Sequence, residues 1–242
     1  MTDLSAMLWK ELREFFGNRR NLWMFLVGAV FLGILPGLSN MKGAGPASSD
    51  PGVVTLLYLV RLFYALLSAV IVVAQVAPDL VLHERVGRTM DYLLATRART
   101  ASMFGAKIMV AAAVGYLSAL VNVWIQLVAV DLLHGGPWQW LYLASPQGRI
   151  IAFAGTASLA LYVSVVATFV GLRAGDQRAA SMITLPFVGL LAVPLITGWV
   201  TPHFSVGFIW GAAGVVALLA VILAAIGLKV FQRQRIASYL QE

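Results

Sequence analysis

Hydrophobic residues along this chain gather in long, nearly uninterrupted runs separated by short polar segments. Each run is close to the about 20 residues that an α-helix needs to cross the hydrocarbon core of a bilayer. The runs are apolar on every face, which excludes the alternating pattern of a membrane β-barrel. A backbone at that depth must satisfy its own hydrogen bonds, so we predict helices. The six predicted spans cover residues 21–38, 60–82, 106–132, 150–172, 181–199 and 205–228.

The first 20 residues have a different, amphipathic pattern. Apolar side chains recur at helical spacing over residues 3–16, and charged ones occupy other angles, including Lys10 and Glu14 one turn apart. We predict an elbow helix within residues 1–20 that lies in the membrane interface and ends at Gly17 and Asn18. The alternative is a charged flank that only anchors the first span.

Composition supports an integral membrane protein. The 242 residues are 60% apolar and 11% charged, whereas a soluble domain is about half apolar and a quarter charged. The polar segments are too short for a soluble catalytic domain, which needs at least about 50 residues. Cysteine is absent, which excludes disulfides, thiolate metal sites and cysteine nucleophiles.

The basic residues predict the orientation. Most of the 17 Lys and Arg residues lie before the first span, in the loop around 83–107, in the turn at 173–178 and after residue 228. With six spans these segments share one side, so the positive-inside rule places both termini in the cytoplasm. The net charge of +7 is therefore a topology signal, and no nucleic-acid partner is predicted. The expected location is the inner or plasma membrane, with several passes.

Motifs for enzymatic chemistry are missing. The sequence contains no G-x-x-x-x-G-K-[ST] phosphate loop, no H-E-x-x-H and no G-x-S-x-G. Its three histidines lie in different loops or span ends, which disfavours haem ligation between helices. We therefore predict no catalytic residues, no metal site and no cofactor bound by this chain.

Polar side chains within the spans are costly in a bilayer and are candidates for function. The candidates in the second and third spans are Gln75, Asp79, Ser118, Asn122 and Gln126. The last three follow one another at intervals of four, so they share a helix face that should look into the protein. They either hold helices together or line a translocation pathway. Pro186 and Pro194 are expected to break the fifth span.

The polar segment 83–102 holds the most informative pattern. Read as a helix from Glu84, it has a charged face and an apolar face. The two faces comprise Glu84, Arg88 and Asp91 on one side and Val86, Met90 and Leu93 on the other. So short a helix is not stable alone in water. It must pack on the ends of its own spans or on another protein.

Residues 84–96, ERVGRTMDYLLAT, resemble the signature of the type-2 ABC exporter permeases. In that family the second span is followed by E-R-x-x-G-T-L-E-x-L-L-A-T-P and then by a G-K pair. Asp91 stands at the second Glu and Lys107 at the Lys of G-K. Arg88 is an extra residue, Arg97 replaces the Pro and Ala106 the Gly, which leaves the end of the loop helix open. The matching residues are Glu84, Arg85, Leu93, Leu94, Ala95 and Thr96.

The resemblance implies a division of labour between chains. The six helices would form half of a pore, completed by a second permease as homodimer or heterodimer. A helix at about 84–94 would be the coupling helix, docked on an ABC ATPase subunit, present in two copies, that binds ATP and Mg²⁺. Its contact residues would be Glu84, Arg85, Val86, Arg88, Met90, Asp91 and Leu93. ATP-driven movement of this helix would switch the spans between inward-open and outward-open states.

Two other classes of function stay open. An ATP-independent channel or secondary transporter would show inverted repeats or broken helices around a charged site at mid-membrane. A membrane-embedded enzyme or redox anchor would need paired histidines or a nucleophile with its base.

Overall fold

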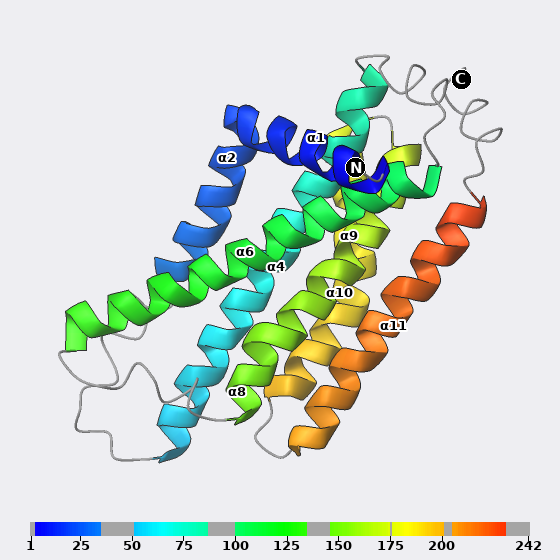
Figure 1. The fold of residues 1–242 in the computed structure, drawn as a ribbon. Helices are drawn as coiled ribbons and strands as arrows, with labels where there is room; N and C mark the ends of the chain where they lie inside the picture. The colour runs from blue at the N-terminus through cyan, green and yellow to red at the C-terminus, as the bar shows by residue number, and fades with distance from the viewer. Residues whose placement is uncertain are drawn as a thin grey trace.

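Several long helices run side by side along the molecule, and others lie across them (Figure 1). The computed structural model describes residues 3–34, 51–86, 100–134, 146–174, 176–200 and 205–230, and every regular element within them is helical. The all-α prediction is confirmed for this part of the chain. The elements are α1 (Asp3–Gly17), α2 (Arg19–Leu26), η1 (Val27–Phe31), α4 (Pro51–Val86), α6 (Thr100–His134), α8 (Pro146–Ile150), η3 (Ile151–Gly155), α9 (Thr156–Arg173), α10 (Gln177–Val200) and α11 (Val206–Val230).

Four stretches of helix are long and apolar enough to cross a membrane. They are Leu62–Glu84, Ala101–Gln126, Pro146–Arg173 and Val206–Lys229. They coincide with the second, third, fourth and sixth predicted spans, and this is compatible with a multi-pass helical membrane protein. Within the described residues, α2 and η1 cover part of the first predicted span and α10 covers the fifth.

Next to the polar segment 83–102, the helices extend beyond the predicted spans. Helix α4 continues past residue 82 to Val86, and α6 begins at Thr100, ahead of residue 106. Glu84 is therefore in the last turn of α4 and Lys107 in the second turn of α6. An apolar run marks the part of a helix that lies in hydrocarbon, but the helix itself continues into polar residues. Glu84 is consequently carried by the end of a long, rigid element.

The expected breaks at Pro186 and Pro194 are wrong, because α10 is one continuous helix from Gln177 to Val200. A proline removes one backbone donor, and in a membrane helix neighbouring groups can satisfy the freed carbonyl.

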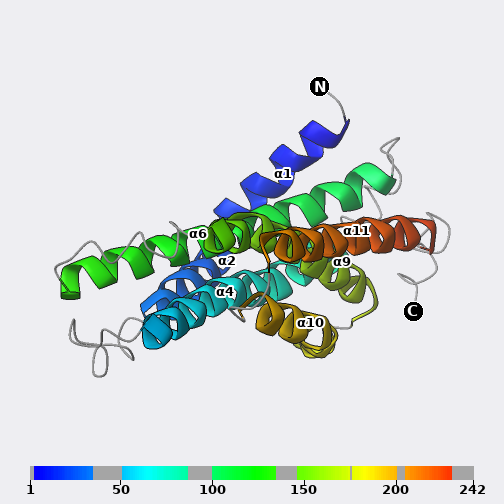
Figure 2. The same cartoon turned by 90° about the horizontal axis from the view of Figure 1, so that it is seen from below.

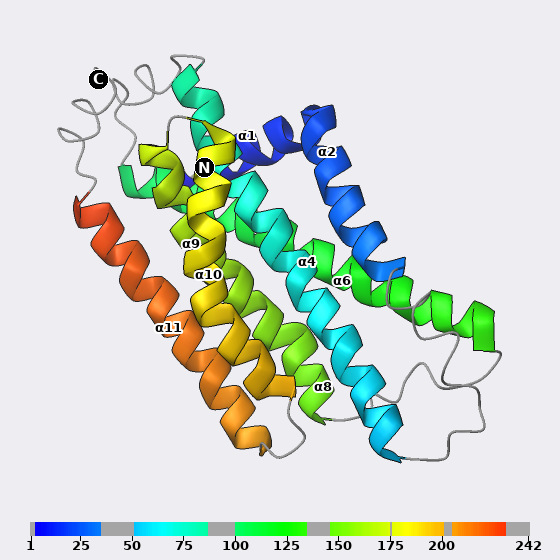
Figure 3. The same ribbon diagram turned by 180° about the vertical axis from the view of Figure 1, so that it is seen from behind.

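Helix α4 is the centre of the bundle. In its most apolar stretch, 83% of the residues are buried, against 22% in α11. Helices α6, α9 and α10 all pack on α4, while α11 packs on α9 (Figure 3). At Gly171 of α9 an added Cβ would lie 2.9 Å from the Cα of Pro78, so only glycine permits this approach to α4.

Helix α1 lies across one end of the bundle, where α4 ends and α6 and α10 begin (Figure 1). Seen from below, α1 and α10 lie on opposite sides of the other helices (Figure 2). Helix α1 is anchored by Phe15, which is buried in the main apolar core. Asn18 then turns the chain, because its side chain accepts a hydrogen bond from the backbone N–H of Arg20 at 3.0 Å and caps α2.

Candidate functional site

The most unusual feature of the molecule is a lysine buried among helices α1, α4 and α6. Lys107 is 1% exposed. Its Nζ donates to Glu11 Oε1 at 2.8 Å and to the backbone carbonyl of Leu80 at 2.9 Å, and lies 2.9 Å from Glu84 Oε2. Three acceptors around one ammonium group compensate much of the large cost of burying its charge.

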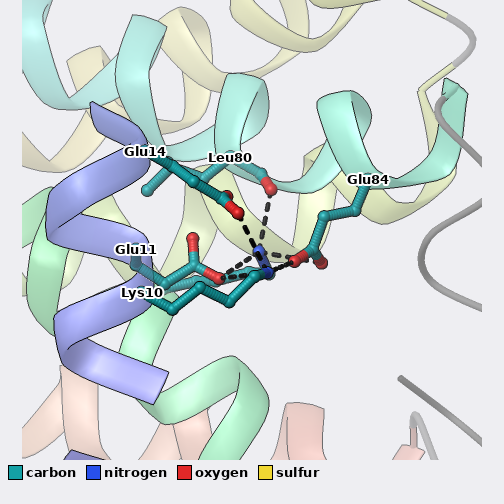
Figure 4. Close-up of polar contacts among 6 residues, drawn as sticks. Lys10, Glu11, Glu14, Leu80 and Glu84 are labelled. Atoms are coloured by element: carbon teal, nitrogen blue, oxygen red, sulfur yellow. Dashed lines mark hydrogen bonds and ion pairs between the residues drawn. The ribbon is translucent and has the colours of Figure 1, made fainter. Parts of the chain in front are cut away.

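A second lysine closes the cluster from the side of α1. Lys10 Nζ donates to Glu84 Oε1 at 2.5 Å and lies 3.5 Å from Glu14 Oε1 and 3.7 Å from Glu11 Oε1. The predicted pair of Lys10 and Glu14 is thereby confirmed. In Figure 4 the two ammonium nitrogens lie between the converging carboxylates. We call Lys10, Glu11, Glu14, Glu84 and Lys107 the ionic cluster.

The ionic cluster contains more acid than base. Its three carboxylates lie within 4.8 Å of one another, a spacing that suits a cation, and two lysines supply the positive charge. Glu11 Oε2 is buried and has no hydrogen-bond partner among the described residues. Burial of the Glu11 carboxyl raises its pKa above the ordinary value, and the charge and hydrogen bond of Lys107 offset this only in part.

The pKa of Lys10 is also raised, but for a different reason. Burial alone would lower the pKa of its ammonium group, but the hydrogen bond and charge of Glu84, with the charges of Glu11 and Glu14, raise that pKa above the ordinary value. The Lys10 ammonium therefore stays charged at neutral pH.

The ionic cluster joins segments that are far apart in the sequence. Glu84 immediately precedes the loop between α4 and α6, and Lys107 follows it by two helical turns. Glu11 and Lys10 come from α1, which packs on α6. The two helices that carry this loop are therefore tied to each other and to α1 by buried charges. A force on the loop would reach all three helices.

An open pocket of about 440 Å³ lies next to the ionic cluster, between α1, α2 and α4. Its wall includes Glu14, Asn21, Asp79 and His83. Asp79, one of the predicted candidates, is buried and forms an ion pair with Arg20 of α2. Asp79 thus finds a charged partner inside the chain and holds α2 against α4.

The polar stripe of α6 faces the protein interior, as predicted. Ser118, Asn122 and Gln126 are all at most 2% exposed. Ser118 Oγ lies 2.8 Å from Ser68 Oγ, Asn122 Nδ2 donates to the carbonyl of Ala29 at 3.2 Å, and Gln126 donates to Asn122 Oδ1 at 2.5 Å.

The stripe bonds to the π-helical segment η1. Ser68 donates to the carbonyl of Gly28 at 3.3 Å, next to the carbonyl that Asn122 reaches. A π-helical turn changes which backbone groups are hydrogen-bonded to each other. Side-chain donors from α4 and α6 bind carbonyl groups of this turn. These contacts favour the helix-packing interpretation of the stripe.

The other predicted site residues have varied positions. Gln75 is half-buried, and its backbone carbonyl accepts from Gln177 Nε2 at 3.2 Å across α4 and α10. Arg85 and Val86 complete the last turn of α4. Arg88, Met90, Asp91 and Leu93 lie outside the described residues, so their role as coupling residues stays a prediction.

Sequence reasoning missed Glu11 as a partner of Lys107. The missed signal is the position of Glu11 on the apolar face of α1, in helical register with Leu8 and Phe15. A carboxylate on that face must be buried when the helix packs, and a buried carboxylate requires a cation.

Comparisons with known proteins give no family. No protein-family model matches the sequence, and no curated protein matches it either.

Proposed function

We propose that this chain is the transmembrane permease subunit of an ABC-type exporter, coupled to a separate ATP-hydrolysing subunit through the loop between α4 and α6. The observation that carries the proposal is the coincidence of two independent features at this loop. Its sequence resembles the family signature, and its two flanking helices are joined by the ionic cluster. A loop that transmits movement must be joined firmly to the helices that it moves.

The physical chemistry of the ionic cluster supports a mechanical role. A buried ion pair contributes little net stability compared with apolar packing, but removing one partner is costly. Such a network therefore favours one arrangement of its helices over slightly displaced ones. Movement of the loop by a partner would rotate α1, α4 and α6 together, as a hinged rigid body does.

We also propose more membrane spans than the four helical stretches that are long and apolar enough to cross a membrane. We infer six spans, with α2 and η1 opening the first and α10 forming the fifth, and α1 as the interfacial elbow. Both termini, the ionic cluster and the loop would lie in the cytoplasm of a cell whose inner or plasma membrane holds the protein. The basic residues around the loop and at the end of α9 support this orientation.

The proposed assembly needs another subunit that binds and hydrolyses ATP, because the sequence of this chain has no phosphate-loop motif. Without a phosphate loop, ATP and Mg²⁺ would bind to an ABC ATPase subunit, in two copies. A second permease copy, identical or homologous, would complete the pathway. The chain itself would be a non-catalytic subunit.

Purification from the native membrane tests the assignment. An affinity-tagged chain should bring down a subunit that contains a phosphate loop, and the complex should hydrolyse ATP. Substitution of the phosphate-loop lysine in that subunit should abolish hydrolysis, while the permease chain alone should show none. Activity in a verified single-chain preparation would contradict the proposal. A preparation that transports without ATP would instead support a channel or secondary transporter.

Cysteine labelling tests the topology, because the chain has no native cysteine. Cysteines introduced at Ser48 and Gln147 should react with an impermeant maleimide from outside the cell. Cysteines at Ser5, Gln177 and Gln234 should react only after permeabilisation. The reverse pattern would refute the orientation without refuting the span count.

A further inference from the structure

An apolar groove of about 580 Å³ lies between α9, α10 and α11, away from the ionic cluster. These three helices run side by side in Figure 3. The walls come from the last three turns of α9, the first turns of α10 and the last turns of α11, and they include Tyr162, Val166, Phe169, Ile183 and Ile226. The groove therefore occupies one half of the bundle, at the end where α9 stops.

The floor of the groove is formed by a close contact between α9 and α11. A Cβ added at Gly227 would come within 2.2 Å of the Phe169 ring, so the glycine lets the ring lie directly against α11. Ile183 and Ile226 stand at the rim and are 46% and 53% exposed. The groove thus has a packed floor and an open, apolar side.

The length of the groove matches one leaflet of a bilayer. From Tyr162 to Arg173 the helix rises about 17 Å, at about 1.5 Å per residue. One leaflet contributes about 15 Å to a hydrocarbon core of about 30 Å. A single acyl chain of that leaflet would follow the groove from the helix end to mid-membrane.

The mouth of the groove carries positive charge. Arg173 lines it, and Arg178 and Lys229 are exposed at the adjoining helix ends. Asp176, an acidic residue in the turn between α9 and α10, accepts a hydrogen bond from the backbone N–H of Ala179 at 2.6 Å and caps α10. Basic residues at the end of an intramembrane groove attract anionic headgroups.

We propose that this groove binds an anionic phospholipid, with one acyl chain between α9, α10 and α11 and the phosphate beside Arg173. The site needs only that these helices lie in a bilayer. It does not depend on the ABC assignment. A lipid here would fill the gap beside α11, which has few buried residues of its own.

Photolabelling of the full chain in vesicles tests the proposal. Vesicles of phosphatidylcholine would carry a phosphatidylglycerol whose acyl chain has a photoreactive group. Labelled peptides should come from 162–173 and 223–227, and unlabelled phosphatidylglycerol should compete at least about five-fold better than phosphatidylcholine, since each basic residue near the surface contributes about 1 kcal/mol.

Matched variants separate the headgroup from the acyl chain. Arg173→Gln should remove about five-fold of the preference for phosphatidylglycerol, whereas Arg13→Gln, at an exposed basic residue of α1, should not. Ile226→Trp should fill the rim and abolish labelling of the groove. Ile222→Trp, one turn earlier on the exposed face of α11, should leave it intact.

Three results would overturn the proposal. Labelling spread evenly over lipid-facing helices would show no site. Equal competition by phosphatidylcholine would show no anionic selectivity. A disulfide between two copies through Ile183→Cys, accompanied by loss of labelling, would show that a second copy covers the groove. Labelling and lipid competition with the unaltered chain decide the first two even if a variant fails to fold.

Discussion

Two buried polar regions lie on the same pair of helices, and they differ in kind. The ionic cluster holds full charges at the ends of α4 and α6, where Lys10 and Glu14 still reach water. The stripe of Ser118, Asn122 and Gln126 begins about 17 Å further along α6 and holds only neutral groups. Of these two regions, the charged one lies at the end of the bundle, where the cost of several kcal/mol for a charge at mid-membrane is avoided.

We therefore propose different roles for the two regions. The stripe packs helices together, and the ionic cluster transmits movement of the loop to the helices. Hydrogen bonds of the stripe join α6 to α4 and η1, which favours helix packing over a pathway lining. The ionic cluster has an excess of carboxylates and leads directly into the loop with the exporter-like sequence. The comparison predicts that both regions affect stability, and that only the ionic cluster affects the response to a partner.

The largest effect is expected from Lys107→Met. The substitution leaves Glu11 and Glu84 buried without their main counter-charge, which should lower the free energy of unfolding by about 3–5 kcal/mol. Thermal unfolding in detergent measures this. Lys229→Met, at an exposed residue near the end of α11, is the control. Adding Glu84→Gln to Lys107→Met should restore part of the loss, and a double variant less stable than either single one would contradict the pairing.

A smaller effect is expected from Glu84→Gln alone. Lys107 keeps Glu11 and the Leu80 carbonyl, so the loss should be nearer 2 kcal/mol, at the low end for a buried charged pair. Glu14→Gln is the matched control, because Glu14 is 44% exposed and its contact with Lys10 should be worth less than about 1 kcal/mol. In the complex, Glu84→Gln should also reduce ATP-driven transport, whereas Glu14→Gln should leave it nearly unchanged.

The stripe should be less sensitive. Asn122→Leu removes the donor to Ala29 and should cost about 0.6 kcal/mol, the average for hydrogen bonds between membrane helices, and at most about 1.7 kcal/mol. Met109→Leu, on an exposed part of α6, serves as the control. Hydrolysis of ATP by the complex should not change per folded molecule. If Asn122→Leu changes the coupling of ATP hydrolysis to transport with little change in stability, the result would contradict the packing role. It would show that the stripe acts in the translocation pathway.

The smallest expected effect is a pH dependence at Glu11. Its pKa is raised in the folded chain, so folding takes up a proton between the unfolded value near 4.5 and the higher folded value. The contribution of Glu11 to stability is therefore complete below that window and is lost as pH rises through it. Glu11→Gln should lack this loss. The free energy of unfolding of the unaltered chain and of Glu11→Gln, measured at acidic and neutral pH, gives the difference. The same change with pH in both chains would contradict the prediction.

The sequence predicted the parts of the fold that depend on apolar runs. Four spans were found because each is a continuous stretch long enough for a bilayer. The predicted second span ends at residue 82, whereas α4 continues to Val86, since Glu84 interrupts the apolar run without interrupting the helix. The stripe on α6 was found because its three residues share one helix face.

The ionic cluster was not predicted, because its members come from three helices. Glu11 and Lys107 are separated by 96 residues, and no local pattern places α1 against α6. The pair of Lys10 and Glu14 was visible only because it lies within one helix. Tertiary packing decides which of several loop charges become buried, and spacing along the chain does not carry that information.

Cross-linking from the loop tests the central claim most directly. Met90→Cys in the cysteine-free chain would carry a maleimide-benzophenone, and Ser48→Cys on the predicted opposite side would be the control. In the purified complex, illumination should join Met90→Cys to the phosphate-loop subunit in high yield and Ser48→Cys not at all. Equal yields from the two positions, or none from Met90→Cys in an active complex, would show that this loop is not where the ATPase docks.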